Sequence, residues 1–244
     1  MKSAISELGA TKAWEFALKH AQLLAFPDIE CLSVVFNACI LNPEVCPEMQ
    51  NKKKTLSNIE RIYKWVETFA KGYDSRISVR TSKMPGTIPD QAIFSIIMSR
   101  LPKLTEVDCS KIVYAHRLAM SAENIQGLLL EEYLSIKMRT FGWFSAWGAT
   151  INAADMCNKQ GDLIQIKNQS NTENSSSNKV RTGTRIHKWY RRDASTSETK
   201  WAELCALIKA PADYMSEEDY QAFIKETLHA NPNALPIEPR NPWL

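Results

Sequence analysis

The sequence lacks the features that mark several classes of protein. Its six cysteines form no CxxC pair and have no HxxxH beside them, so the sequence gives a zinc site little support. We expect these cysteines to be reduced and mostly buried. No apolar run approaches the ~18 residues that span a bilayer, and the first residues lack the apolar core of a signal peptide. We therefore expect a soluble cytoplasmic protein without a membrane partner.

The sequence also has little net charge. It contains 30 Lys and Arg against 27 Asp and Glu, a formal charge of +3, so nucleic-acid binding would depend on local clustering of positive residues. For the run Lys52-Lys53-Lys54, a solvated charge cluster in a linker is a better interpretation than a phosphate contact. The 244 residues are 44% hydrophobic, which is enough to bury a sizeable core.

Helical spacing of apolar residues dominates the first 120 residues. Three segments before residue 75 show it, and the third has Ser57 as a predicted N-cap and Gly72 as a predicted end. Residues 76–83 indicate a short strand, and residues 88–101 resume helical spacing with Asp90 in the first turn. We interpret this region as scaffold.

A change of pattern follows residue 120. Residues 121–138 predict a helix with Ser121 as N-cap, and two β-like stretches follow Gly142, joined by a tight turn at 159–161. Further on, helical spacing returns after residue 198. The predicted organisation is a mainly helical N-terminal region, a core with C-terminal helices, and a proline-rich tail, over residues 1–120, 121–230 and 231–244.

The predicted hairpin brings three polar side chains together. With a turn at 159–161, paired positions add up to about 320, which sets Asp155 opposite Gln165. Gln165 and Lys167 share a face because side chains alternate along a strand. A one-residue slip in the turn would move Asp155 to the other face.

The helix before the hairpin can add a second carboxylate. Glu131 lies on one stripe with Gly127, Leu130 and Leu134, on the side expected to face the sheet. Glu132 lies on an adjacent stripe and is the alternative. We prefer Glu131.

These residue types suit metal-assisted hydrolysis of a phosphodiester. Carboxylate and amide oxygens from Asp155, Glu131 and Gln165 can hold a hard cation such as Mg²⁺. Lys167 can then orient or deprotonate the attacking water and offset charge on the phosphate.

The segment after the hairpin is suited to binding DNA. Residues 179–192 contain Lys and Arg, aromatic residues and no acid, and the preceding loop is rich in Asn and Ser. Such cations neutralise phosphates, and the polar side chains can read base edges. The candidate DNA-binding residues are Asn168, Asn171, Asn174, Ser175, Ser176, Lys179, Arg181, Arg185, Lys188 and Arg191.

Residues 121–192, above all ENSSS and KWYRR, resemble the type II restriction endonucleases of the SinI and AvaII kind. The resemblance implies an α/β (α+β) fold with a PD-(D/E)xK nuclease core, in which a central mixed sheet is flanked by helices. It matches the superfamily's Asp with Asp155, its lysine with Lys167 and its helix glutamate with Glu131. At the position where the superfamily usually has a glutamate, this sequence has Gln165. It also implies Mg²⁺-dependent cleavage of double-stranded DNA at GG(A/T)CC or a related palindrome.

Two further partners are expected. Two strands cut symmetrically need two sites, and a homodimer matches the symmetry of a palindrome. A cognate DNA methyltransferase would protect the host's own DNA. The alternatives are a structure-selective nuclease, such as a junction resolvase or repair enzyme, and a DNA-binding protein without catalysis.

Overall fold

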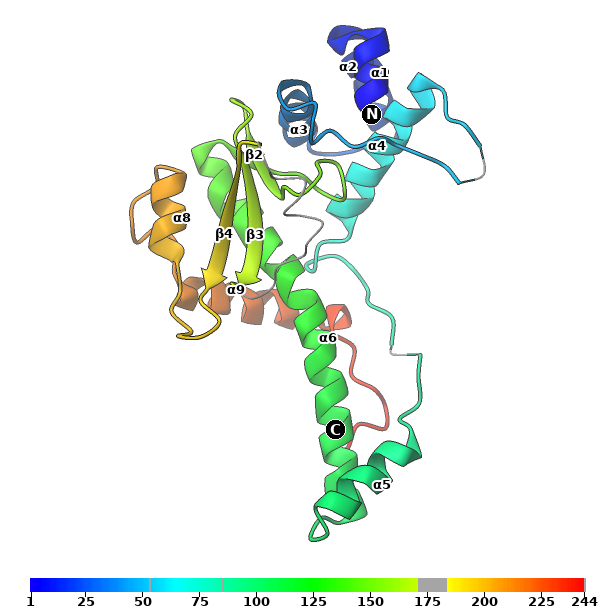
Figure 1. The fold of residues 1–244 in the computed structure, drawn as a ribbon, viewed down its shortest axis with the longest axis vertical. Helices are drawn as coiled ribbons and strands as arrows, with labels where there is room; N and C mark the ends of the chain where they lie inside the picture. Colours follow the sequence, from blue (N-terminus) through cyan, green and yellow to red (C-terminus); the bar gives the residue numbers. More distant parts are fainter. Residues whose placement is uncertain (53, 85, 171–183, 244) are drawn as a thin grey trace.

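The computed structural model describes residues 1–52, 54–84, 86–170 and 184–243. Figure 1 shows an elongated molecule in which the long helix α6 runs from the sheet to a projecting end. In chain order the elements are α1 (Lys2–Leu8), α2 (Ala10–Leu23), α3 (Ile29–Leu41), α4 (Asn58–Asp74), α5 (Gln91–Arg100), α6 (Glu106–Lys137), the 3₁₀ helix η1 (Met138–Phe141), β1 (Trp143–Ser145), β2 (Met156–Asn158), β3 (Leu163–Gln169), β4 (Ile186–Arg192), α8 (Trp201–Leu207), α9 (Glu217–Ala230) and η2 (Pro232–Ala234).

The strands form one mixed sheet. Its order is β1-β2-β3-β4, in which β2 is antiparallel to both β1 and β3, and β4 is parallel to β3. Only the two ends of the first predicted β-like stretch are strands, and residues 146–155 form a loop between them. Helices flank this sheet, which makes the fold α+β, as expected.

Each face of the sheet belongs to a different hydrophobic core. Phe144, Cys157 and Leu163 pack with α1 to α4. Met156 and Ile164 pack with the second half of α6 and with α8 and α9. Since side chains alternate along each strand, this division fixes which residues of β2 and β3 share a face.

Helix α4 begins where the sequence predicts and ends later. Ser57 is its N-cap, in a capping box with Glu60. Gly72 does not end the helix. A Cβ atom on Gly72 would lie 2.2 Å from the backbone nitrogen of Gly148, so this position must be glycine for the loop 146–155 to lie against α4. Gly148 itself has a φ of 68°, which favours glycine.

Two expectations for residues 76–121 are wrong. Residues 76–83 are not a strand: residues 77–79 form a turn that contains the buried Ile77, with the amide of Val79 donating to the Arg76 carbonyl, and residues 80–83 have no regular secondary structure. Ser121 is not an N-cap, because α6 already begins after Thr105, which forms a capping box with Asp108 sixteen residues before the predicted cap.

The start of α5 and the tail have clear local causes. Asp90 is the N-cap of α5, and its carboxylate accepts a hydrogen bond from the Ala92 amide at 2.9 Å. Ser216 caps α9, where its side chain accepts a hydrogen bond from the Asp219 amide at 3.1 Å. The tail lies along α6, where Glu238 forms an ion pair with Arg117 at 2.8 Å.

All six cysteines are free and buried, as expected. Within the described part of the chain, no helix is both long and apolar enough to cross a membrane. The division of the chain at residue 120 stays a prediction.

Candidate active site

The hairpin of β2 and β3 has the predicted register. Met156 pairs with Ile164 and Cys157 with Leu163, which continues to Asp155 beside Gln165. The Asp155 amide donates to the Ile164 carbonyl at 2.8 Å, and the Asp155 carboxylate accepts from the Ile166 amide at 2.6 Å. The backbone of β3 therefore forms hydrogen bonds with both the main chain and the side chain of Asp155.

Strand β4 extends the polar face that Gln165 and Lys167 form on β3. In the parallel register, Gln165 lies beside Lys188 and Lys167 beside Tyr190. The Lys188 Nζ atom lies 4.7 Å from the centre of the Tyr190 ring. A cation and an aromatic ring thus flank the two candidate residues of β3.

The two neighbouring glutamates of α6 have different surroundings. Glu132 is 3% exposed, and its Oε2 atom accepts a hydrogen bond from the Ser78 amide at 3.1 Å. Glu131 is half-buried and interacts electrostatically with Asp155 and Lys167. The structure thus brings Glu131, and not Glu132, to the candidate site.

The carboxylates of Glu131 and Asp155 both resist ionisation. Burial and, secondarily, the charge of Asp155 raise the pKa of Glu131 to about 8, although Lys167 acts in the opposite direction. Burial raises the pKa of Asp155 to about 6, against the lowering effects of the Ile166 amide and Lys167. Because two buried carboxylates this close repel each other when both are ionised, they bind a proton or a cation readily.

Gln165 supplies an oxygen without a protein partner. Its side chain is 4% exposed, and its buried Oε1 atom has no hydrogen bond among the described residues. Leaving such an acceptor unsatisfied costs about 1–3 kcal/mol, so a ligand at this atom would stabilise the site. The described residues contain no group of three His, Cys, Asp or Glu that could hold a metal. Two carboxylates and this amide oxygen nevertheless fit a hard cation that keeps part of its water.

The two candidate DNA-binding residues on β4, Lys188 and Arg191, lie on opposite faces of the strand. Arg185 is exposed, and Lys188 lies on the face of the candidate site. Arg191 points to the other face, where it is 4% exposed, pairs with Glu217 and donates to the Asn168 Oδ1 atom at 3.1 Å. The remaining candidates lie outside the described residues: Asn171, Asn174, Ser175, Ser176, Lys179 and Arg181.

Tyr190 and Arg192 share the polar face but were not among the predicted site residues. Arg192 pairs in register with Gln169, next to the pair of Lys167 and Tyr190. The alternation of residues 186–192 was a signal for a strand. The sequence contained no signal that this strand would lie parallel to β3.

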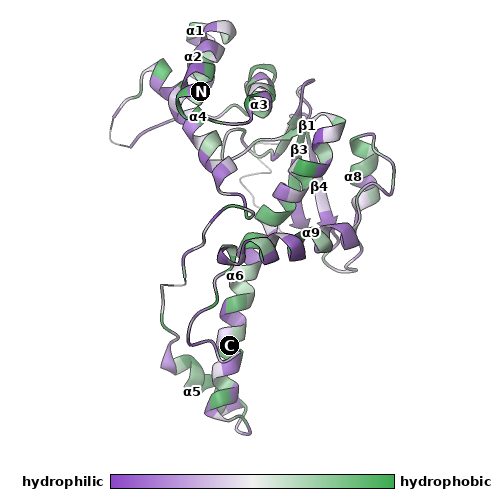
Figure 2. Ribbon diagram, turned by 180° about the vertical axis from the view of Figure 1, so that it is seen from behind, coloured by the Kyte–Doolittle hydropathy of each residue, from purple (hydrophilic) through white to green (hydrophobic). Residues whose placement is uncertain are grey.

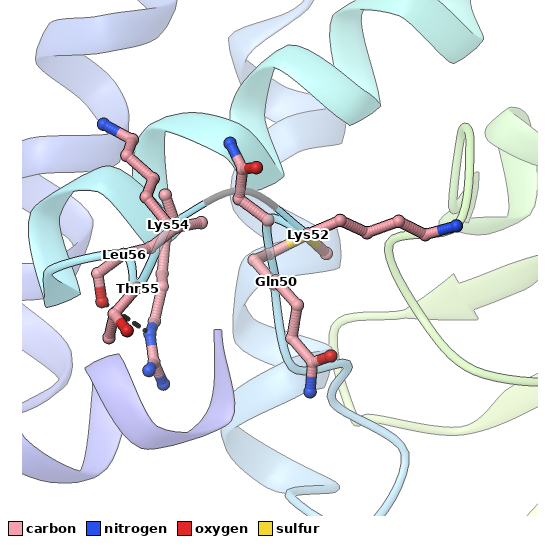
Figure 3. Close-up of a pocket in the computed structure, with 8 residues that line it drawn as sticks. Gln50, Lys52, Lys54, Thr55 and Leu56 are labelled. Atoms are coloured by element: carbon pink, nitrogen blue, oxygen red, sulfur yellow. Dashed lines mark hydrogen bonds between the residues drawn. The ribbon is translucent and has the colours of Figure 1, made fainter.

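A polar pocket lies where the segment before α4 meets the first turn of that helix. It has a volume of about 480 Å³ and is lined by residues 49–52, 54–56 and Arg61. Figure 3 shows Lys52 and Lys54 pointing in different directions, and Lys54 pairs with the exposed Glu60 at 2.6 Å. Both lysines are exposed, in agreement with the solvated interpretation. No carboxylate lines this pocket, so we place the chemistry at Asp155 instead.

Known proteins resemble this chain over most of its length. A sequence model of the SinI restriction endonuclease family matches residues 24–230. The type II restriction enzyme Eco47I of Escherichia coli is 34% identical over 191 residues, which cover 76% of this chain and 81% of the relative. The type II restriction enzyme SinI of Salmonella infantis is 31% identical over 193 residues, with the same coverage of 76% and 81%. The chain therefore belongs to the SinI restriction endonuclease family, whose members are type II site-specific deoxyribonucleases.

Proposed function

We propose that the protein is a Mg²⁺-dependent endonuclease that cuts double-stranded DNA through a PD-(D/E)xK-like core. The observation that carries this proposal is that Glu131, Asp155 and Lys167 interact with one another, next to Gln165 in the strand register, whose buried Oε1 atom has no partner among the described residues. The two carboxylates and the amide oxygen would hold Mg²⁺. When bound, Mg²⁺ stabilises charge on the scissile phosphate and makes a bound water more acidic.

Lys167 and Asp155 would have different roles in the reaction. Lys167 lies on the same face as Gln165, so its ammonium group can orient the attacking water and offset the charge that develops on the phosphate. Asp155 is held by the Ile166 amide, which leaves its other carboxylate oxygen for the cation. The rigid β3 backbone keeps these groups in place.

DNA would lie along the polar face of β3 and β4. Arg185 and Lys188 carry the positive charge near the site, and the proposed base-reading residues are in the loop between these strands. We leave Arg191 out of the DNA contacts, since its guanidinium group pairs with Glu217 and holds Asn168. Asn168 alternates with Lys167 and lies with Arg191 on the other face, near the end of β3 that leads into the proposed base-reading loop.

We infer the target and the biological setting from the family. The proposed target is GG(A/T)CC or a related GC-rich palindrome, cut by a homodimer in the cytoplasm. A companion methyltransferase would complete a restriction-modification system. The two-fold symmetry of such a target supports the homodimer.

A plasmid assay tests the proposal. Purified protein is incubated with plasmid DNA, with Mg²⁺ or with EDTA, and the products are separated on a gel. Discrete fragments that appear only with Mg²⁺, with ends that map to GG(A/T)CC, are the expected result. Cleavage confined to DNA junctions, or a mobility shift without any cutting, would contradict it.

A substitution tests the site within the same assay. Lys167→Ala should lower the cleavage rate at least ~100-fold, because it removes the group that acts on the water and phosphate. Its circular dichroism and DNA binding in Ca²⁺ should match those of the wild type. Undiminished cleavage by this variant would place the chemistry elsewhere.

A further inference from the structure

The half of α6 that precedes the core forms a projecting arm. We define the arm as residues 86–120, which include α5 and the start of α6, together with tail residues 235–243. The tail is attached to it by the ion pair of Arg117 with Glu238, and the Lys111 Nζ atom lies 5.4 Å from the centre of the Trp243 ring. Figure 2 shows that α5 and this end of α6 extend away from the sheet and the other helices.

The arm has almost no core of its own. Residues 86–120 are all described, and only Cys109 and Val113 among them are buried. Two short helical stretches with so little buried apolar surface do not hold together in water, because packing supplies most of the stability of a helix.

Large apolar side chains of the arm face solvent instead. The exposed fractions are 85% for Ile88, 65% for Ile96, 60% for Val107 and 51% for Leu101. Ile93, at 46%, lies one turn before Ile96, so the two are neighbours on one side of α5. So many exposed apolar side chains in one short region indicate an interaction surface.

Local signals show that the arm is a specified structure. Asp90 caps α5, and Thr105, the residue directly after the Leu101–Leu104 turn, caps α6 in a capping box with Asp108. Residues within the arm therefore specify the turn between α5 and α6. What the arm lacks is a partner for its apolar side chains.

The charge of the arm indicates a protein partner rather than DNA. Residues 86–120 contain four Lys and Arg against three Asp and Glu, a net charge of +1. By contrast, residues 184–192 contain four Lys and Arg and no acid. A surface that binds phosphates needs such a cluster of cations, and the arm has none.

We propose that the arm binds the arm of a second copy of this chain. Two such arms related by a two-fold axis would form a four-helix arrangement that buries the exposed isoleucines and Val107. Each copy needs to bury about 800 Å² for a stable interface, which is within reach of the many large apolar side chains that the arm exposes. The two-fold part of the argument rests on the proposed function.

Matched charge substitutions test the interface by sedimentation velocity. The wild type should sediment with twice the chain mass of 27.7 kDa. Ile96→Asp should raise the dissociation constant of the dimer at least ten-fold, because it places two unpaired charges in an apolar interface. Leu23→Asp is the control, since Leu23 is 72% exposed but lies on α2, and it should not change the dimer. A monomeric wild type, or a dimer unaffected by Ile96→Asp, would overturn the proposal.

Cross-linking locates the interface directly. All six native cysteines are buried, so Ile96→Cys adds an accessible thiol. A long bismaleimide should link two Ile96→Cys chains and leave two Leu23→Cys chains unlinked. Equal cross-linking of the two variants would count against the arm.

The two proposals fail independently. If the wild type cuts DNA but dimerises through another surface, only the arm interface is wrong. If the arm mediates a dimer that does not cut DNA, only the proposed function is wrong.

Discussion

At the scale of the residue, adjacent glutamates on α6 have different surroundings. Glu131 is close to Asp155 and Lys167, whereas Glu132 accepts a hydrogen bond from the backbone of residue 78. Helix geometry turns consecutive side chains by about 100°, so one faces the site and the next faces the scaffold.

Exchanging each carboxylate for an amide tests the two glutamates separately. Glu131→Gln should lower the cleavage rate at least ~100-fold, since a metal ligand with a charge becomes neutral. Glu132→Gln should cut within a few-fold of the wild-type rate, because its amide oxygen still accepts from Ser78. Steady-state cleavage of a short duplex measures both rates. The reverse ranking would assign the site to Glu132.

The raised pKa of Glu131 predicts how metal-free stability depends on pH. The folded protein holds a proton at Glu131 up to about pH 8, whereas the unfolded chain releases it near 4.5. The folded state is therefore penalised as the pH rises from 4.5 to 8. Glu131→Gln should remove this penalty and raise Tm by roughly 2–4 °C at pH 8.5, but much less at pH 5. Thermal unfolding in EDTA measures this, and an equal Tm shift at both pH values would contradict it.

At the scale of the element, the two faces of β4 serve different purposes. Lys188 lies beside Gln165 on the proposed DNA face, and Arg191 is buried against Glu217 on the other. Alternation along one strand thus separates a proposed DNA contact from a structural ion pair.

This separation predicts opposite effects for two neighbouring cations. Lys188→Ala should weaken DNA binding and reduce the salt slope by about 1, with little effect on Tm. Arg191→Ala should lower the free energy of unfolding by about 1–3 kcal/mol, because the half-buried Glu217 would lose its charged partner. Binding titrations at several salt concentrations and urea unfolding distinguish them. An unchanged salt slope in Lys188→Ala would remove it from the DNA contacts.

The contact of α4 with the loop 146–155 depends on two glycines. Gly72→Ala should cost about 2–4 kcal/mol in the free energy of unfolding, since its Cβ atom would meet the backbone of Gly148. Gly127→Ala is the control, because a Cβ atom on that helical glycine meets nothing within 4 Å. It should stabilise the protein by about 0.5–1 kcal/mol. Similar effects of both substitutions would show that the close approach is not rigid.

At the scale of the whole molecule, α6 joins two regions with very different packing. Residues 125, 129, 130, 133 and 134 are buried in the core beside the sheet. Residues 106–120 include only Cys109 and Val113 as buried residues. One continuous helix therefore spans a stable and a weakly packed region.

Hydrogen exchange should reveal this difference. In Ile96→Asp, the amides of α5 and of residues 106–120 should exchange at least ~10-fold faster than those of residues 125–134. In Leu23→Asp, dimer contacts should keep the arm protected. Uniform protection along α6 in Ile96→Asp would show that the arm is stable without a partner.

The sequence by itself determined those features that depend on neighbours in the chain. The turn at residues 159–161 and strand alternation predicted the register of Asp155, Gln165 and Lys167, and Ser57 predicted the start of α4. Each of these depends on hydrogen bonds between residues a few positions apart.

Only the tertiary structure decided the features that depend on distant contacts. The parallel pairing of β4, the choice of Glu131 over Glu132, and the need for glycine at position 72 require segments that the sequence does not place side by side. The early start of α6 shows the same limit. The helical spacing of apolar residues is clear after Ser121, but the helix already begins at Glu106. A carboxylate next to a sheet and a carboxylate that caps a backbone amide look alike in sequence, and only packing assigns their surroundings.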